Sequence, residues 1–117
     1  ALQVYETVGK TWTMTELMET GEQVYAQACQ SCHQANGQGI PPAFPSLVGQ
    51  GLAIGPVDAH IDIVVNGKAG SAMQAFAAQL NPAEIAAVVT YERNAWGNNV
   101  GDLVQPRAVN ALISSEE

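Results

Sequence analysis

The chain has 117 residues, a length typical of a single domain, and 47% of them are apolar, although 18 of these are alanine. It is strongly acidic, with 4 Lys and Arg against 11 Asp and Glu and a net charge of −7. Binding to nucleic acid needs clustered cations that neutralise phosphates, so that class of function is excluded. No apolar run approaches the roughly 20 residues that cross a bilayer. Two Phe, two Trp, three Met and three Tyr are few large side chains for this length, so we expect something other than side chains to fill the core.

The residues before Thr13 show no clear periodicity and are interpreted as a connecting segment. From Met14, apolar residues recur every three or four positions, which predicts an amphipathic helix that ends near Gln30. Thr13 and Glu16 have the spacing of a capping box at the start of this helix. Gly21 in its middle costs about 1 kcal/mol relative to Ala, so we expect another backbone to pass close to it.

Residues 34–57 are rich in Gly and Pro, which predicts a long, ordered loop rather than regular structure. Asp58 is interpreted as the N-cap of a short helix, because an apolar helical pattern follows it. The pair Asn66-Gly67 is typical of a helix end and predicts where this helix stops.

Residues 68–80 predict a second loop, which holds Met73 and Phe76. Asn81-Pro82-Ala83-Glu84 then combines a capping residue, Pro at the first helical position and Glu at the third, which predicts a helix that continues to about Asn94. After Gly97 the sequence is polar, and we expect a loosely held tail.

Cys29-Gln30-Ser31-Cys32-His33 is the C-x-x-C-H pattern by which haem c is attached. Two thiols three residues apart at a helix end can reach the two vinyl-derived carbons of one porphyrin edge, and the next His can point its imidazole at the iron. Two other interpretations are open. A C-x-x-C pair can be a redox dithiol in a βαβ unit, although no strands are predicted here. A zinc site needs four ligands, and Cys29, Cys32, His33 and His60 would supply them.

A six-coordinate haem iron needs a second axial ligand, and the candidates are Met14, Met18, Met73 and His60. Met14 and Met18 lie on the apolar helical stripe, which favours ordinary core packing. His60 falls in the first turn of the short helix, where we expect a surface or capping residue. Met73 lies in a loop outside any periodic stripe, 40 residues after His33, and is the favoured ligand.

Residues 20–94 resemble class I cytochrome c, an all-α fold whose N- and C-terminal helices cross and whose haem is enclosed by short helices and loops. The resemblance rests on Gly21 with Tyr25, the Cys29–His33 motif, Pro45-Ser46-Leu47-Val48-Gly49, and Val88 with Tyr91. It implies that the two helices cross at Gly21. We therefore divide the chain into a connecting segment (1–12), a cytochrome c domain (13–96) and a C-terminal tail (97–117).

The resemblance also implies one covalent haem c, with thioethers at Cys29 and Cys32, His33 as the proximal iron ligand and Met73 as the distal one. A backbone carbonyl of the Pro-x-Leu segment accepts the other ring N–H of the proximal His in this family, and Pro45 is the candidate here. We expect an apolar pocket lined by Phe44, Leu47, Ile54, Val65, Phe76, Val88 and Tyr91, and donors to the haem propionates among Trp96, Lys68, Ser71 and Asn66. With both axial positions filled, the expected function is one-electron transfer without a catalytic site of its own.

Four segments resemble, more narrowly, the haem c domain at the C-terminus of bacterial cytochrome c oxidase subunit II; they are Lys10–Met14, Pro41–Pro45, Ala72–Phe76 and Tyr91–Asn98. This resemblance implies a tethered domain on the periplasmic side of the inner membrane. It would receive electrons from a cytochrome or respiratory complex and pass them to the copper-binding domain of the same subunit. Four cations do not make the lysine ring of soluble cytochromes c, and a tether supplies effective concentration without charge steering. A free periplasmic carrier is one alternative, and a ligand-sensing or peroxidatic haem protein with a displaceable Met73 is another.

Overall fold

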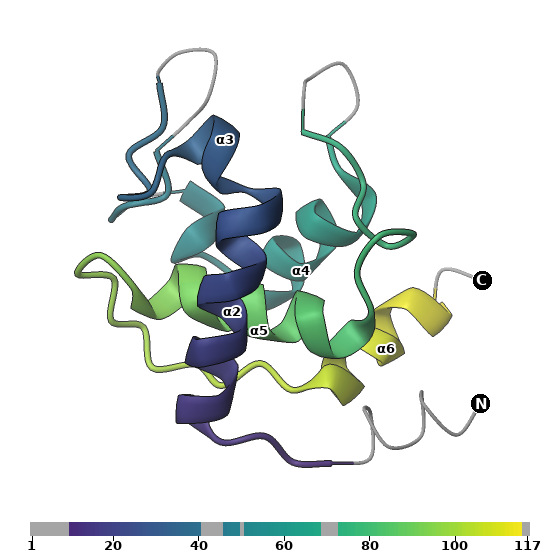
Figure 1. Ribbon diagram of the computed structural model, residues 1–117. Helices are drawn as coiled ribbons and strands as arrows, with labels where there is room; N and C mark the ends of the chain where they lie inside the picture. Colours follow the sequence, from purple (N-terminus) through teal and green to yellow (C-terminus); the bar gives the residue numbers. More distant parts are fainter. Residues whose placement is uncertain (1–9, 41–45, 50, 69–72, 116–117) are drawn as a thin grey trace.

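The computed structural model describes residues 10–40, 46–49, 51–68 and 73–115. Its elements are α2 (Met14–Ala28), α3 (Gln30–His33), the 3-10 helix η1 (Gly51–Ala53), α4 (Val57–Asn66), α5 (Pro82–Asn94) and α6 (Pro106–Ser115) (Figure 1). This described part of the chain contains no β-strand, and the predicted all-α fold is confirmed.

Helix α2 begins where the sequence predicts. The Thr13 hydroxyl accepts a hydrogen bond from the Glu16 backbone N–H at 3.2 Å, and the Glu16 carboxylate accepts one from the Thr13 N–H at 3.0 Å. This capping box satisfies two N–H groups that the first turn would leave without a partner. The helix buries one face, formed by Leu17, Gly21, Val24 and Tyr25.

Helix α5 is the centre of the fold, and α2, α4, α6 and η1 all pack against it. Its start is also as predicted, with a second capping box between Asn81 and Glu84. Figure 1 shows α2 crossing α5. A Cβ atom added to Gly21 would lie 2.6 Å from the Cβ of Tyr91, so the predicted close approach of a second helix at this glycine is confirmed.

Helix α4 ends at Asn66 as predicted, and Gly67 follows with a φ of +71°. Its start differs slightly from the prediction. Pro56 is the residue before the helix and Val57 its first member, so Asp58 lies within the first turn instead of at the N-cap. An acidic residue in the first turn is still favourable, because the helix dipole is positive there.

The expectation of a loosely held tail after Gly97 is wrong. Residues 106–115 form α6, which packs against α5 and α4, and Val104 and Val109 are buried. The physical reason is a helical apolar face made by Val109, Leu112 and Ile113, which the polar composition of the segment conceals.

The start of α6 is also fastened to the start of α2. The Gln105 side chain accepts a hydrogen bond from the Trp12 backbone N–H at 2.8 Å and donates one to the Trp12 carbonyl at 3.0 Å. Gln105 thus pairs with both backbone groups of Trp12, as a neighbouring strand would. We call this pair the Trp12–Gln105 clasp.

Candidate functional site

The C-x-x-C-H motif forms one tight turn at the end of α2. The Cys29 carbonyl accepts hydrogen bonds from the N–H groups of Cys32 at 3.2 Å and His33 at 3.0 Å, so α3 restarts the helix directly after Cys29. Neither cysteine is in a disulfide. The Cys29 side chain is buried, whereas those of Cys32 and His33 are partly exposed. The turn therefore holds two thiols and an imidazole within five residues.

The electrostatics of Cys29 do not suit a redox dithiol. Burial raises the pKa of its thiol, and the charge of Glu92 raises it further. Reactive C-x-x-C dithiols instead lower the pKa of one cysteine to generate a thiolate. Because the described residues also lack the strands of a βαβ unit, the dithiol interpretation finds no support.

The zinc interpretation fails on the position of His60. The His60 ring is 2% exposed, and its Nε2 atom lies 2.7 Å from a carboxylate oxygen of Glu92. His60 thus points into the interface of α4 with α5, and the expectation of a surface or capping residue is wrong. The reason is that Glu92 and Arg93 on α5 satisfy the ring inside the protein. In the part of the chain that the structure describes, no group of three or more His, Cys, Asp or Glu could hold a metal ion.

The loop after the motif is held by hydrogen bonds on several sides. The Tyr25 hydroxyl donates to the Gln34 carbonyl at 2.6 Å, the Gly39 N–H to the His33 carbonyl at 2.9 Å, and the Trp96 indole to the Ala35 carbonyl at 2.9 Å. The indole N–H of Trp96 therefore fastens the loop to the segment that follows α5.

Asn98 fastens a second part of this region, and sequence reasoning missed it. Its side-chain amide donates to the carbonyls of Leu47 at 2.7 Å and Glu92 at 2.9 Å, while its oxygen accepts from the Gly49 N–H at 2.7 Å. The segment that carries Leu47 is thereby tied to the end of α5. This segment directly follows Phe44 and Pro45, which lie outside the described residues.

Met73 lies beyond the end of α4 in the predicted second loop. The Lys68 N–H donates to the Met73 carbonyl at 3.0 Å, and the Phe76 N–H donates to the Val64 carbonyl at 2.9 Å. The first bond joins the residues on the two sides of 69–72 to each other, and the second fastens the end of the loop to α4. The Met73 side chain is partly buried against the core. In Figure 1 the chain on either side of 69–72 and α3 lie toward the same end of the molecule.

The other predicted pocket residues fall into distinct places. Val65, Phe76 and Val88 are buried in the core, Leu47 is partly buried against it, and Ile54 is exposed. The Tyr91 ring packs against Tyr25, with ring centroids 5.6 Å apart, and against Trp96 at 5.4 Å. Tyr91 thus belongs to an aromatic cluster that joins α2, α5 and the loop after the motif.

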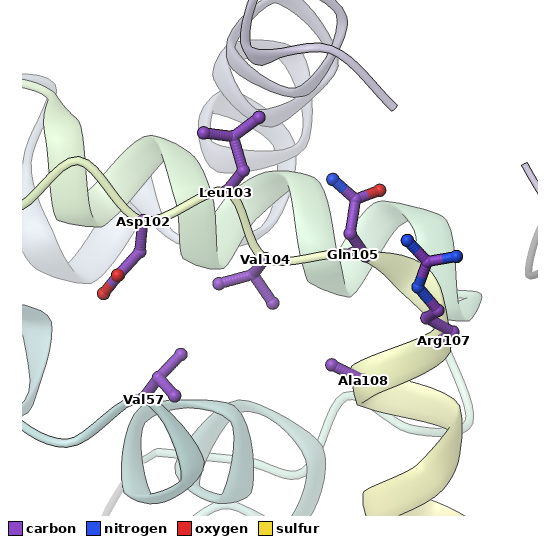
Figure 2. Close-up of a pocket in the computed structure, with 7 residues that line it drawn as sticks. All are labelled: Val57, Asp102, Leu103, Val104, Gln105, Arg107 and Ala108. Carbon is purple, nitrogen blue, oxygen red and sulfur yellow. The ribbon is translucent and has the colours of Figure 1, made fainter. Parts of the chain in front are cut away.

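A surface hollow of about 510 Å³ lies elsewhere, between the start of α4 and the segment that leads into α6 (Figure 2). It is lined by Val57, Asp102, Leu103, Val104, Gln105, Arg107 and Ala108. The hollow takes no lining residue from α2 or α3 and contains no thiol, imidazole or thioether. It is therefore separate from the C-x-x-C-H site.

The residues present fit a covalently attached haem. Two cysteines outside any disulfide share one helical turn with an imidazole, and a partly buried methionine stands on a separate, anchored loop. This set of thiols, imidazole and thioether matches the attachment and axial ligation of haem c. Among the described residues, no helix is long and apolar enough to cross a membrane.

Comparisons with known proteins agree with this chemistry. Residues 16–91 match the model of the family described as Cytochrome C oxidase, cbb3-type, subunit III. Cytochrome c-552 of Thermus thermophilus is 40% identical over 92 residues, which cover 67% of this chain and 69% of that protein. A second cytochrome c-552, from a named strain of the same species, is also 40% identical, and 61% of its length is covered.

The gluconate 2-dehydrogenase cytochrome c subunit of Pantoea cypripedii is 29% identical over 109 residues, which cover 84% of this chain and 25% of that subunit. The family model spans well over half of the chain. The alignment with the first Thermus cytochrome covers 67% of this chain and 69% of that protein. The chain therefore belongs to the cbb3-type subunit III family of cytochrome c domains, and it is an electron-transfer domain with one covalent haem c.

Proposed function

We propose that Cys29 and Cys32 hold the haem through thioethers, that His33 and Met73 are its axial ligands, and that the domain relays electrons to the copper centre of a terminal cytochrome c oxidase. The observation that carries the assignment is the tight turn at Cys29, which presents both thiols and the imidazole from the end of one helix. Bound haem c supplies a one-electron iron couple.

The chain's own residues have separate tasks in this proposal. The Met73 thioether favours the reduced iron relative to a second imidazole. Pro45, which lies outside the described residues, is the proposed source of the backbone carbonyl for the other ring N–H of His33, a partner that would set the direction and basicity of the ring. Asn98 supports this arrangement, because it ties the segment after Pro45 to α5.

The oxidase part of the proposal is supported by the family description, which names an oxidase subunit, although subunit III of the cbb3 type and not subunit II, and by the charge of −7. A domain with four cations has little charge with which to steer itself onto an acidic oxidase surface, and tethering to the copper-binding domain of the same subunit removes that need. The proposed location is the periplasmic face of the bacterial inner membrane. The Pantoea relative is named as a dehydrogenase subunit, so an electron carrier for another complex is the competing function.

The ligand assignment is tested by Met73→Ala, with Met18→Ala as the matched control on α2. We expect Met73→Ala to convert the low-spin haem to a high-spin or water-ligated form and to lower its reduction potential. Met18→Ala should leave the low-spin spectrum in place. An unchanged spectrum for Met73→Ala would refute the assignment of the distal ligand.

Carbon monoxide separates electron transfer from ligand sensing. Because both axial positions are filled in this proposal, the reduced protein should not bind carbon monoxide at neutral pH, whereas reduced Met73→Ala should bind it. Ready binding by the unaltered protein would favour a sensor or peroxidase with a displaceable methionine.

The partner is tested by stopped-flow mixing of the reduced protein with a purified copper-binding domain of an oxidase subunit II. We expect rapid one-electron oxidation of the haem, with a rate that changes little between low and high salt. Transfer to the copper domain no faster than to an unrelated cupredoxin would contradict the oxidase proposal and favour a carrier for another complex.

A further inference from the structure

A cluster of four charged or titratable side chains, three of them buried, lies apart from the proposed haem ligands. His60 on α4 is 2% exposed, and Glu92 and Arg93 on α5 are 5% and 3% exposed. Asp102, on the segment before α6, closes the cluster from the outside, with 44% of its side chain exposed. Burial of charged groups is unfavourable unless they are paired, so each of these contacts matters.

The hydrogen bonds define the role of each member. The Arg93 guanidinium donates to Asp102 at 2.8 Å, to the Gly55 carbonyl at 2.8 Å and to Nδ1 of His60 at 3.3 Å. A guanidinium has only donors, so Nδ1 of His60 accepts and the ring proton is on Nε2. That proton is donated to Glu92 across 2.7 Å.

This arrangement leaves the Glu92 charge only partly compensated. Asp102 takes the ion pair with Arg93, and Glu92 receives a hydrogen bond from the uncharged form of His60. Two ionised carboxylates and one guanidinium leave one negative charge in excess. A charge held in a low-dielectric interior acts over a longer distance than one on the surface.

Glu92 lies near the end of α2 that carries the attachment site. Tyr91, the residue before it, packs its ring against Tyr25 in the last part of α2, with ring centroids 5.6 Å apart. The Asn98 amide also joins the Glu92 carbonyl to the Leu47 carbonyl. In agreement with this geometry, the Glu92 charge raises the pKa of the Tyr25 hydroxyl, second to burial. A fixed negative charge stabilises ferric over ferrous iron, because the ferric state has one more positive charge.

We propose that Glu92, with its carboxylate positioned by His60, lowers the reduction potential of the haem. This inference rests on the proposed attachment of haem at Cys29, and it adds a residue that the family comparison does not assign. His60 is a positioning residue, and Arg93 with Asp102 holds His60 in the tautomer that donates to Glu92.

The test is a spectroelectrochemical titration of three haem-bearing variants, Glu92→Gln, Asp102→Asn and Glu19→Gln, each of which removes one carboxylate charge. Glu19 lies on the exposed face of α2 and serves as the control. We expect Glu92→Gln to shift the ferric–ferrous equilibrium toward ferrous iron by about tenfold, which is about 59 mV for one electron. Asp102→Asn should give a smaller shift in the same direction, because solvent screens that carboxylate, and Glu19→Gln should stay within about twofold of the parent.

Equal shifts in all three variants would overturn the inference, because they would show a general surface-charge effect. An unchanged potential in a low-spin Glu92→Gln protein would overturn it as well, and would leave the cluster with a purely structural role. If Glu92→Gln does not fold, the comparison of Asp102→Asn with Glu19→Gln decides, and equal potentials there refute the proposal. A parent protein without a haem spectrum would contradict the proposed function itself, which is a separate result.

Discussion

The hydroxyl of Tyr25 donates a 2.6 Å hydrogen bond to the backbone carbonyl of Gln34, the residue directly after the C-x-x-C-H motif. The backbone of Gln34 has a φ of +69°, in the left-handed region that residues other than glycine rarely adopt. The bond therefore joins the last turn of α2 to the point where the chain leaves α3. Cys29, Cys32 and His33 lie in the sequence between the two residues that this bond joins.

Tyr25→Phe should remove this hydrogen bond and change how the free energy of unfolding depends on pH. Burial first, and the Glu92 charge second, raise the pKa of Tyr25 above its ordinary value of 10.0. The folded protein thus holds the phenolic proton more tightly than the unfolded chain, so this group leaves stability unchanged below about pH 10 and decreases it as pH rises above that value. We expect Tyr25→Phe to lose about 1 kcal/mol at neutral pH and to show a shallower decline above about pH 10, measured by urea unfolding. A decline as steep as that of the parent would contradict this account.

Gly21→Ala tests the helix crossing. The added Cβ would lie 2.8 Å from the carbonyl carbon of Ala87, so α2 and α5 would have to separate. We expect a loss of about 1–3 kcal/mol in unfolding free energy, although Ala is the better helix former by about 1 kcal/mol. Gln23→Ala, on the exposed face of the same helix, should be neutral or slightly stabilising. A more stable Gly21→Ala protein would show that the two backbones are not in contact.

Asn98→Ala removes the three hydrogen bonds that hold the 46–49 segment to α5. Because the side chain is buried, its former partners lose their hydrogen bonds, and we expect a cost of about 1–3 kcal/mol in thermal or urea unfolding. Hydrogen exchange at the Gly49 amide should also become faster. Asn99→Ala changes the exposed neighbour and provides the control. Equal effects of the two substitutions would argue against a stabilising role for the Asn98 hydrogen bonds.

Val109→Ala measures how firmly α6 is held. Val109 is fully buried where α6 meets the core, and removal of two methyl groups should cost about 1–3 kcal/mol. Val100→Ala, at a position that is 39% exposed, should change stability by less than about 0.5 kcal/mol. If α6 were only a loose tail, both substitutions would be equally mild, and urea unfolding distinguishes the two cases.

Features encoded within a few residues could be predicted from the sequence. The capping boxes at Thr13 and Asn81 each need only a partner three residues away, and the C-x-x-C-H turn is complete within five residues. The crossing at Gly21 was also predictable, because a glycine in an otherwise good helix calls for a neighbour.

Features that depend on distant partners could not be predicted. His60 meets Glu92 across 32 residues of sequence, so its position in the first turn of a helix pointed to the surface. The Asn98 side chain donates a hydrogen bond to the Leu47 carbonyl, 51 residues away in the sequence, and no local pattern predicts this contact. Helix α6 is different, since Pro106 followed by Val109, Leu112 and Ile113 is a readable helical face that the polar composition of the tail concealed.

The Trp12–Gln105 clasp has a practical consequence for attaching the domain to a device. The 15 residues of α2 rise about 1.5 Å each, which places roughly 22 Å between the clasp and the turn at Cys29. A linker introduced at Lys10 would therefore hold the molecule by the end remote from its redox group. On an electrode, such an anchor should leave that group facing solution, whereas a linker in the loop after His33 should bring it toward the metal surface.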